Sequence, residues 1–403
     1  MPDNTVDSNP ILNPLPRQHA GDDYTGTEVR LANRNSGIHL EMLRHDVTPI
    51  GMHYLLSHFD VPYVTDENDW SLELKGLIGK PRKLGLRELR QLPFQERAVT
   101  LECAGNGRAL LRPRWSSMAW TCEAVSTARW GGTSLSALME RLEPQAGADT
   151  VVFCGADRGV DGGHLHAFER SLSLQQIAAT DVMLVWQING QPLPPQHGFP
   201  LRLIVPGWYG MASVKWLREI RFTDKPFQGY QQVKTYHYRE SDEDKGTPIT
   251  DMRVKSLMVP PGLPDWYTRN RLLASGSVEL HGRAWTGGGR RVRRVEVSVQ
   301  KIDSSQNAKT GDIEAATAAS VNAATPELDW HLATLAAGDE PYAWAGWSWL
   351  WDAEPGHFRL RCRATDDQGD VQPLLARWDR GGFGNNVVQT VDVWVEKELP
   401  QTT

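Results

Sequence analysis

The chain has few cysteines, no long apolar stretch and only a small net charge. It contains four cysteines in 403 residues, with no CxxC pair among them: Cys103, Cys122, Cys154 and Cys362. This number and spacing argue against a disulfide framework and against a thiolate zinc site. No run of about 18 apolar residues, the length that spans a bilayer as a helix, occurs. The net charge of −6 argues against a general nucleic-acid or membrane-surface binder.

The N-terminal segment lacks a targeting pattern. Up to about Tyr24 it is polar and contains prolines, without the basic and then apolar order of a secretion signal. We therefore expect a cytoplasmic protein, or a periplasmic one if a leader has been removed.

The first two thirds of the chain predict a mixed α+β fold. The stretch 70–93, WSLELKGLIGKPRKLGLRELRQLP, alternates apolar and polar residues, turns between Gly76 and Pro81, and passes into a short helical pattern. In STARWGGTSLSALMERL a loop enters a helix, with Thr133 or Ser134 as the N-cap. DTVVFCGADRG and PLRLIVPGWYG are apolar strands that run into glycine turns, which places Asp157 and the segment 202–210 at strand ends.

The last third predicts a β-sandwich. After a connector at VPPGLP, short alternating strands are bounded by Gly, Asp or Asn in SVELHGRAWTGGGRRVRRVEVSVQ, HFRLRCRATDDQGDVQP and VVQTVDVWVE. The Ala- and Thr-rich segment 303–326 is interpreted as a surface insertion. PYAWAGWSWLWD holds four of the 16 tryptophans. We assign them to packing rather than to a carbohydrate-binding platform.

The stretch TLECAGNGR places Cys103 between a β-rich run and a glycine turn that ends on Arg108. A free cysteine is most often a small buried hydrophobe. A reactive or metal-binding thiolate is the alternative, because a neighbouring arginine lowers a thiol pKa.

Four motifs in this order, TLECAGNGR, STARWGG, LPPQHGFPLRLIVPGWYGMASVKWL and GRAWTGGGRRVRRVEVSV, resemble the sulfite oxidase family of molybdenum enzymes. The resemblance runs from about His53 to Val395. It implies an N-terminal extension at 1–45, a molybdopterin-binding catalytic domain at 46–245 and an immunoglobulin-like dimerisation domain at 246–403. It also implies a homodimer and a chain without a haem domain.

In this family one cysteine thiolate binds molybdenum beside the two dithiolene sulfurs of a pyranopterin. The resemblance assigns that role to Cys103, and soft thiolate ligands suit such a centre. It further implies that Gly105 and Gly107 let the backbone approach the cofactor closely. Cys122, Cys154 and Cys362 are left as core residues.

The pterin phosphate needs donors and positive charge. By motif position, the resemblance assigns contacts with the cofactor to Tyr54, Ser57, His58, Asp157, His197, Arg202, Ser213, Val214 and Lys215, together with Cys103. Taken alone, His197 would be a loop histidine and Arg202 a sheet-edge ion pair.

The resemblance also implies a small anionic substrate, sulfite, bound by Arg108, Trp120, Tyr236 and Arg380. Tyr236 is preferred over Tyr238, and the match at Arg380 requires a small gap. Sulfite oxidases typically carry an arginine in a segment like FFxRNH, where this chain has HYLLSH, with Leu56 at that position. The missing guanidinium would weaken anion binding by about 1.5–3 kcal/mol.

Several alternatives stay open. His164 and His166 share one face of a strand and are usable by a metal, but we favour a polar strand edge because no third ligand has matching spacing. The expected function is oxidation of sulfite to sulfate, with the electrons passing either to oxygen or to a separate acceptor. A molybdenum-dependent reductase of sulfoxides or other oxo compounds is the second possibility. A non-enzymatic adhesion protein built on the β-sandwich is the third.

Overall fold

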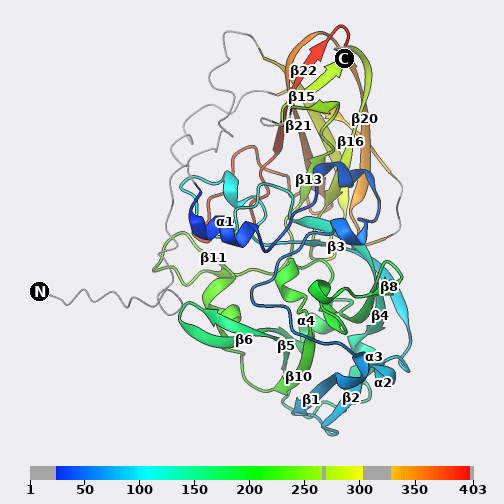
Figure 1. Cartoon of the computed structure of the whole chain (residues 1–403), viewed down its shortest axis with the longest axis vertical. Coiled ribbons are helices and arrows are strands. Elements are labelled where there is room, and N and C mark those ends of the chain that lie inside the picture. The colour runs from blue at the N-terminus through cyan, green and yellow to red at the C-terminus, as the bar shows by residue number, and fades with distance from the viewer. Residues whose placement is uncertain (1–23, 266–268, 303–327, 337, 339, 400–403) are drawn as a thin grey trace, which may run out of the picture.

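The computed structural model describes residues 24–265, 269–302, 328–336, 338 and 340–399. The predicted insertion at 303–326 therefore lies outside the described residues. The molecule is elongated, with one group of strands at each end of its long axis (Figure 1). This arrangement confirms the expected α+β fold followed by a β-sandwich.

The end of the molecule that lies opposite the sandwich is built on a mixed sheet in the order β2-β1-β10-β5-β6. Its strands are β1 (Ser71–Gly76), β2 (Arg82–Gly85), β5 (Thr150–Asp161), β6 (His164–Ser173) and β10 (Leu217–Thr223). The expected turn joins β1 to β2, and Gly76 adopts a φ of 88°, a conformation open to glycine. Helix α2 (Leu86–Leu89) follows β2 directly, as the pattern predicted.

A second sheet runs in the order β3-β4-β7-β8, with β9 also paired to β7. Its strands are β3 (Gln95–Glu102), β4 (Val125–Ser134), β7 (Met183–Ile188), β8 (Gln191–Pro192) and β9 (Arg202–Ile204). The other helices and helical turns are α1 (Gly26–Ala32), α3 (Leu135–Met139), α4 (Leu174–Ala178), η1 (Leu40–Arg44), η2 (Ile50–Met52), η3 (Glu67–Asp69), η4 (Arg108–Leu110), η5 (Pro195–His197), η6 (Gly210–Ala212) and the π-type turn η7 (Gln231–Thr235). Ser134 caps α3 by accepting a hydrogen bond from the backbone N–H of Ala137 at 3.1 Å, so the second of the two predicted caps is the one used.

The sandwich consists of two sheets, in the orders β13-β16-β20-β19 and β14-β15-β22-β21-β17-β18. Their strands are β13 (Lys255–Met258), β14 (Leu263–Pro264), β15 (Arg271–Ala274), β16 (Gly276–Trp285), β17 (Val292–Lys301), β18 (His331–Leu332), β19 (Thr334–Leu335), β20 (Ala345–Ala353), β21 (Gly356–Asp366) and β22 (Gln389–Glu396). A separate hairpin pairs β11 (His237–Tyr238) with β12 (Thr247–Pro248).

Two apolar cores divide the molecule, and one of them crosses the expected domain boundary. The sandwich core holds Leu280, Trp347 and Leu360, whereas Trp285 and Trp344 join the core of the N-terminal sheets. The boundary at 245/246 stays a prediction. Within the tryptophan-rich segment, Trp344, Trp347 and Trp351 are buried, as the packing interpretation expects.

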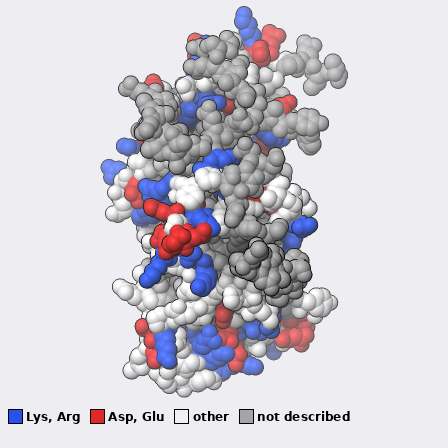
Figure 2. Space-filling view, turned by 90° about the vertical axis from the view of Figure 1, so that its left-hand side faces the viewer, with Lys and Arg blue, Asp and Glu red and all other residues white. Residues whose placement is uncertain are grey.

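The surface carries both signs of charge. Lys and Arg are interspersed with Asp and Glu over the described part of the face in Figure 2. In the described ranges, no helix combines the length and apolarity needed to cross a membrane.

Candidate active site

A pocket opens among the N-terminal sheets where loops distant in sequence meet. Its walls are formed by His53, Tyr54, Leu55, Leu56, His58, Leu101, Cys103, Ala104, Asp157, Phe168, His197, Arg202, Gly210, Met211, Ser213, Lys215, Trp216 and Tyr236. Most residues predicted to bind the cofactor are therefore brought together at one place, although they come from segments spread between Tyr54 and Lys215.

Ser57 and Val214 lie beside the pocket rather than on its wall. The Oγ of Ser57 accepts a hydrogen bond from the Nζ of Lys215 at 2.8 Å. Val214 is buried, and its backbone carbonyl accepts a hydrogen bond from the N–H of Leu203 at 2.8 Å. Both residues hold the wall in place, and their contact with a cofactor stays a prediction.

Asp157 does not lie at the end of its strand, which corrects the expectation. It sits inside β5, where the pairing with β6 shifts register between Cys154 and Arg158. An irregularity of this kind changes the direction in which a side chain points, and here the side chain of Asp157 points into the pocket. Gly155 leaves the necessary room, since a Cβ there would come within 2.4 Å of the Asp157 carboxylate.

Lys215 is held by three oxygen atoms in and beside the wall. Its Nζ donates to the carbonyl oxygens of Leu56 at 2.9 Å and Gln196 at 3.0 Å, and to Ser57 Oγ. Burial lowers its pKa to about 7, and burial raises the pKa of the facing Asp157 to about 7. An anion that enters the pocket would therefore favour the protonated, positively charged form of Lys215.

Arg202 adds a second cationic side chain to the wall, and this one is buried. Its Nη1 and Nη2 donate to the carbonyl oxygens of His197 at 3.0 Å and Ser213 at 3.2 Å, and its guanidinium lies 4.8 Å from the ring centroid of Trp130. Among the residues that the structure describes, its Nε has no hydrogen-bond partner and no carboxylate forms an ion pair with it. A buried guanidinium of this kind fits an anionic group such as the pterin phosphate.

His53 is a pocket residue that sequence reasoning missed. It is buried, its Nε2 has no partner in the described part of the chain, and its ring centroid lies 5.2 Å from that of His197. Burial lowers its pKa to about 4 and also lowers the pKa of His197. Both rings are therefore neutral near pH 7 and have polar atoms available for a polar ligand.

Cys103 follows the last residue of β3 and contributes a buried, free thiol to the pocket. Burial raises its pKa, while Arg108, the backbone N–H of Gly105 and the indole N–H of Trp120 lower it. Among the described residues, the Trp120 Nε1 has no hydrogen-bond partner of ordinary geometry. Within the described ranges, no three His, Cys, Asp or Glu side chains gather as a metal site. A single free thiol on the pocket wall fits a soft metal held mainly by a cofactor.

The other cysteines have no such setting. Cys154 and Cys362 are buried, and Cys122 is half-buried against the core.

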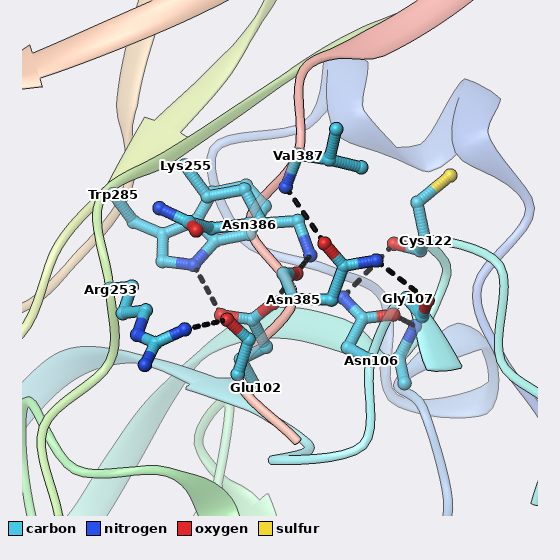
Figure 3. Close-up of polar contacts among 12 residues, drawn as sticks. Glu102, Asn106, Gly107, Cys122, Arg253, Lys255, Trp285, Asn385, Asn386 and Val387 are labelled. Atoms are coloured by element: carbon cyan, nitrogen blue, oxygen red, sulfur yellow. Dashed lines mark hydrogen bonds and ion pairs between the residues drawn. The ribbon is translucent and has the colours of Figure 1, made fainter. Parts of the chain in front are cut away.

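The segment that carries Cys103 is fixed by a buried polar cluster (Figure 3). The carboxylate of Glu102 accepts hydrogen bonds from three donors, Asn106 Nδ2 at 2.9 Å, Lys255 Nζ at 3.0 Å and Trp285 Nε1 at 2.9 Å. Asn385 Nδ2 donates to the carbonyl oxygen of Gly107 at 2.8 Å. Sequence reasoning missed this cluster, although the charge of Glu102 beside Cys103 was a readable signal.

The two glycines of this segment leave room for neighbouring side chains. A Cβ at Gly105 would lie 2.6 Å from the guanidinium of Arg108, and one at Gly107 would lie 3.0 Å from the side chain of Asn385. They make room for these side chains, and neither lines the pocket. Their expected close approach to the cofactor stays a prediction.

Of the four residues predicted to bind substrate, Tyr236 lines the pocket and is hydrogen-bonded through its hydroxyl to His58 Nε2 at 2.7 Å. Arg108 lies behind the wall, where it donates to the carbonyl oxygens of Met118 and Gly381, each at 2.9 Å. Trp120 is buried near Cys103.

The structure does not bring Arg380 to the pocket wall. Its guanidinium stacks 3.5 Å from the ring centroid of Trp115 and pairs with Asp242. The predicted roles of Arg108, Trp120 and Arg380 toward substrate stay predictions.

Strand β6 contributes two further residues that were missed. Phe168 lines the pocket and stacks on His58, with ring centroids 4.7 Å apart. Arg170, two positions on, is buried on the same face, and the alternation of HLHAFERSLS could have indicated both. His164 and His166 lie on this edge strand, as the polar-edge interpretation predicted.

Two family models match the chain. The oxidoreductase molybdopterin binding domain matches residues 58–231, and the Mo-co oxidoreductase dimerisation domain matches residues 246–396. Among curated proteins, the NADPH nitrate reductase of Fusarium oxysporum is 29% identical over 375 residues, covering 84% of this chain and 39% of that protein. An NADH nitrate reductase of Brassica napus is 32% identical over 295 residues, covering 67% of this chain and 32% of that protein. The chain therefore spans well under half the length of these relatives.

Among solved structures, the sulfane dehydrogenase SoxCD from Paracoccus pantotrophus has the same fold. The match has a TM-score of 0.70 at 24% identity and covers 89% of this chain and 85% of that chain. Because the two family models match consecutive segments that make up most of the sequence, the protein belongs to the molybdopterin oxidoreductases, with the domain architecture of the sulfite oxidase family.

Proposed function

We propose that the protein is a molybdenum-dependent oxidoreductase that oxidises sulfite to sulfate. The observation that carries this proposal is the Cys103 thiol, which faces a pocket whose walls hold the buried Arg202 and the half-buried Lys215. In the balanced reaction, sulfite and water give sulfate, two protons and two electrons, and the electrons pass to a separate acceptor.

The cofactor would be held by residues on two sides of the pocket. Cys103 would ligate the molybdenum, while Arg202, Lys215 and Ser213 would bind the anionic end of the pterin. When bound, the molybdenum cofactor supplies two-electron oxygen-atom transfer. The protein supplies orientation and charge.

The protein's own side chains would bind and orient the substrate beside Cys103. The Tyr236 hydroxyl, already hydrogen-bonded to His58, is placed to donate to an oxyanion and to exchange a proton with the His58 ring. Phe168 and Leu56 add apolar wall, which excludes water and strengthens these polar contacts.

Reduction of an oxo compound is the second candidate. Leu56 lines the pocket where a sulfite oxidase would carry an arginine, so one expected anion contact is missing. The relatives described above are nitrate reductases, which adds nitrate to the sulfoxides as a candidate substrate.

Paired assays on the purified protein separate the candidates. Sulfite with ferricyanide as acceptor tests the first, and nitrate or dimethyl sulfoxide with a reduced viologen dye tests the second. We expect close to one molybdenum per chain by elemental analysis and faster turnover of sulfite. Turnover of nitrate or sulfoxide alone would replace the first proposal by the second, and protein isolated without molybdenum would contradict both.

We further propose that the protein forms a homodimer, because its C-terminal segment matches a dimerisation domain. Light scattering coupled to size exclusion would give twice the chain mass if this is correct.

A further inference from the structure

Arg170 is a buried cation directly behind the substrate side of the pocket. It lies on β6 and is 5% exposed, on the same face as the pocket residue Phe168. Its guanidinium carbon lies 5.4 Å from the ring centroid of Tyr236, and its Nη1 donates to the carbonyl oxygen of Gln231. Arg170 therefore contacts the residue that carries the pocket hydroxyl, without itself lining the pocket.

Arg170 has no direct ion pair among the residues that the structure describes. In the described part of the chain, its Nε has no hydrogen-bond partner and no carboxylate forms an ion pair with it. The adjacent Glu169 is 3.7 Å from Arg221, on the opposite face of β6. Asp161, which faces the same region, accepts a hydrogen bond from Gln231 Nε2 at 3.1 Å.

Burial of an unpaired guanidinium opposes folding strongly, so such a residue is retained where a negative charge compensates it. An anion bound in the pocket beside Tyr236 could compensate the charge of Arg170. Leu56, which lines the same pocket, has an apolar side chain, and its carbonyl oxygen already accepts a hydrogen bond from Lys215.

We propose that Arg170 is the positioning residue that makes the Tyr236 side of the pocket selective for small oxyanions, in place of the guanidinium that position 56 lacks. This inference rests on the proposed function, because it specifies the substrate class of the same site. Arg170 acts through Tyr236. A cation over the ring face orients the phenol and strengthens its hydroxyl as a donor, and the positive field favours an anion at the Tyr236 hydroxyl.

Sulfate binding to the purified, cofactor-loaded protein provides the test, because it needs no turnover. Calorimetric titration with sodium sulfate would compare the wild type with Arg170→Met, which removes the charge from an unbranched side chain, and with Arg170→Lys, which keeps the charge. Arg218→Met is the matched control, since Arg218 is exposed on β10 of the same sheet. We expect the Kd for sulfate to rise about tenfold or more in Arg170→Met. Arg170→Lys should recover most of the affinity, and Arg218→Met should not change it.

Steady-state kinetics of the wild type and Arg170→Met distinguish a charge effect on anion binding from a purely structural role of Arg170. In Arg170→Met, KM for the anionic substrate should rise about tenfold, with a much smaller change in kcat. KM for neutral dimethyl sulfoxide should stay near the wild-type value. Circular dichroism melting confirms folding, and Arg170→Gln serves as the neutral variant if Arg170→Met does not fold.

The outcomes separate this inference from the proposed function. In one outcome the wild type turns over no sulfite and still binds sulfate, with that binding lost in Arg170→Met. This result would end the sulfite proposal and leave the anion selectivity supported. Equal sulfate affinity in the wild type and the neutral variant would overturn the inference, as would wild-type protein that binds no sulfate. Equal losses in the Lys and Met variants would also overturn it, because charge would then not be the cause.

Discussion

The carboxylate of Glu102 and the ammonium group of Lys255 lie 3.0 Å apart, and both side chains are buried. This pair joins the residue immediately before Cys103 to the first residue of β13 in the sandwich (Figure 3). Lys255 also donates to the carbonyl oxygen of Asn385 at 2.9 Å. The C-terminal sheets therefore help to fix the segment that presents the thiol, in addition to any role in dimerisation.

Lys255→Met should destabilise the protein strongly. The substitution leaves the Glu102 carboxylate buried with two neutral donors, and breaking a buried pair in this way costs about 3–5 kcal/mol. Urea denaturation measures this loss, and elemental analysis should show reduced molybdenum content because the Cys103 segment is no longer fixed. Lys75→Met is the control, since Lys75 is partly exposed and its pair with Glu219 should contribute no more than about 1 kcal/mol. Equal losses of unfolding free energy in the two variants would contradict the assignment.

Cys103→Ser should give a folded protein without normal molybdenum chemistry. A serine hydroxyl fills the same small space but is a poor ligand for a metal that prefers soft thiolates. We expect turnover to fall at least a hundredfold, with a melting temperature close to that of the wild type. Cys122→Ser is the matched control, because Cys122 is half-buried away from the pocket wall. Wild-type turnover in Cys103→Ser would rule out the ligand role.

The sequence allowed the architecture and most of the pocket to be predicted, because both depend on local signals in a fixed order. Alternating residues and glycine turns predicted β1, β2 and the sandwich, and ordered motifs predicted pocket residues such as His197 and Arg202. What could not be predicted depends on side-chain contacts across the chain. The direction of the Asp157 side chain depends on a register shift between β5 and β6, and the stacking of Arg380 on Trp115 joins two residues that are far apart in the sequence.

The Glu102 cluster shows the same limit. A carboxylate beside Cys103 is visible in the sequence, but its partners Lys255 and Trp285 lie more than 150 positions away. No local pattern pairs them.

Leu56→Arg should improve the binding of an anionic substrate. A guanidinium at this position of the wall adds a charge-assisted hydrogen bond worth about 1.5–3 kcal/mol, or roughly a ten- to hundredfold lower KM for sulfite. Leu56→Met changes shape without charge and should leave KM within about twofold of the wild type. Steady-state kinetics with sulfite at constant ionic strength measure the effect. An unchanged or higher KM in Leu56→Arg, with folding intact, would show that position 56 does not face the bound anion.

Lys215 determines how the stability of the cofactor-free protein should depend on pH. Burial lowers its pKa from 10.5 to about 7, so between these values the unfolded chain holds a proton that the folded chain has released. The contribution of Lys215 to stability therefore rises with pH across this window, by at most about 1.4 kcal/mol per pH unit. Asp157, whose pKa burial raises to about 7, titrates between its ordinary value and that point, below this window.

Urea denaturation of the cofactor-free wild type and of Lys215→Met, at about pH 7 and about pH 9, measures this dependence. We expect the wild type to gain about 1–2 kcal/mol relative to the variant at the higher pH. Lys80→Met, at an exposed pair with Glu143, should show no such change. An anionic group bound beside Lys215 favours the charged ammonium. The cofactor-loaded protein should therefore lose the rise, and a rise of equal size with and without cofactor would place the phosphate elsewhere.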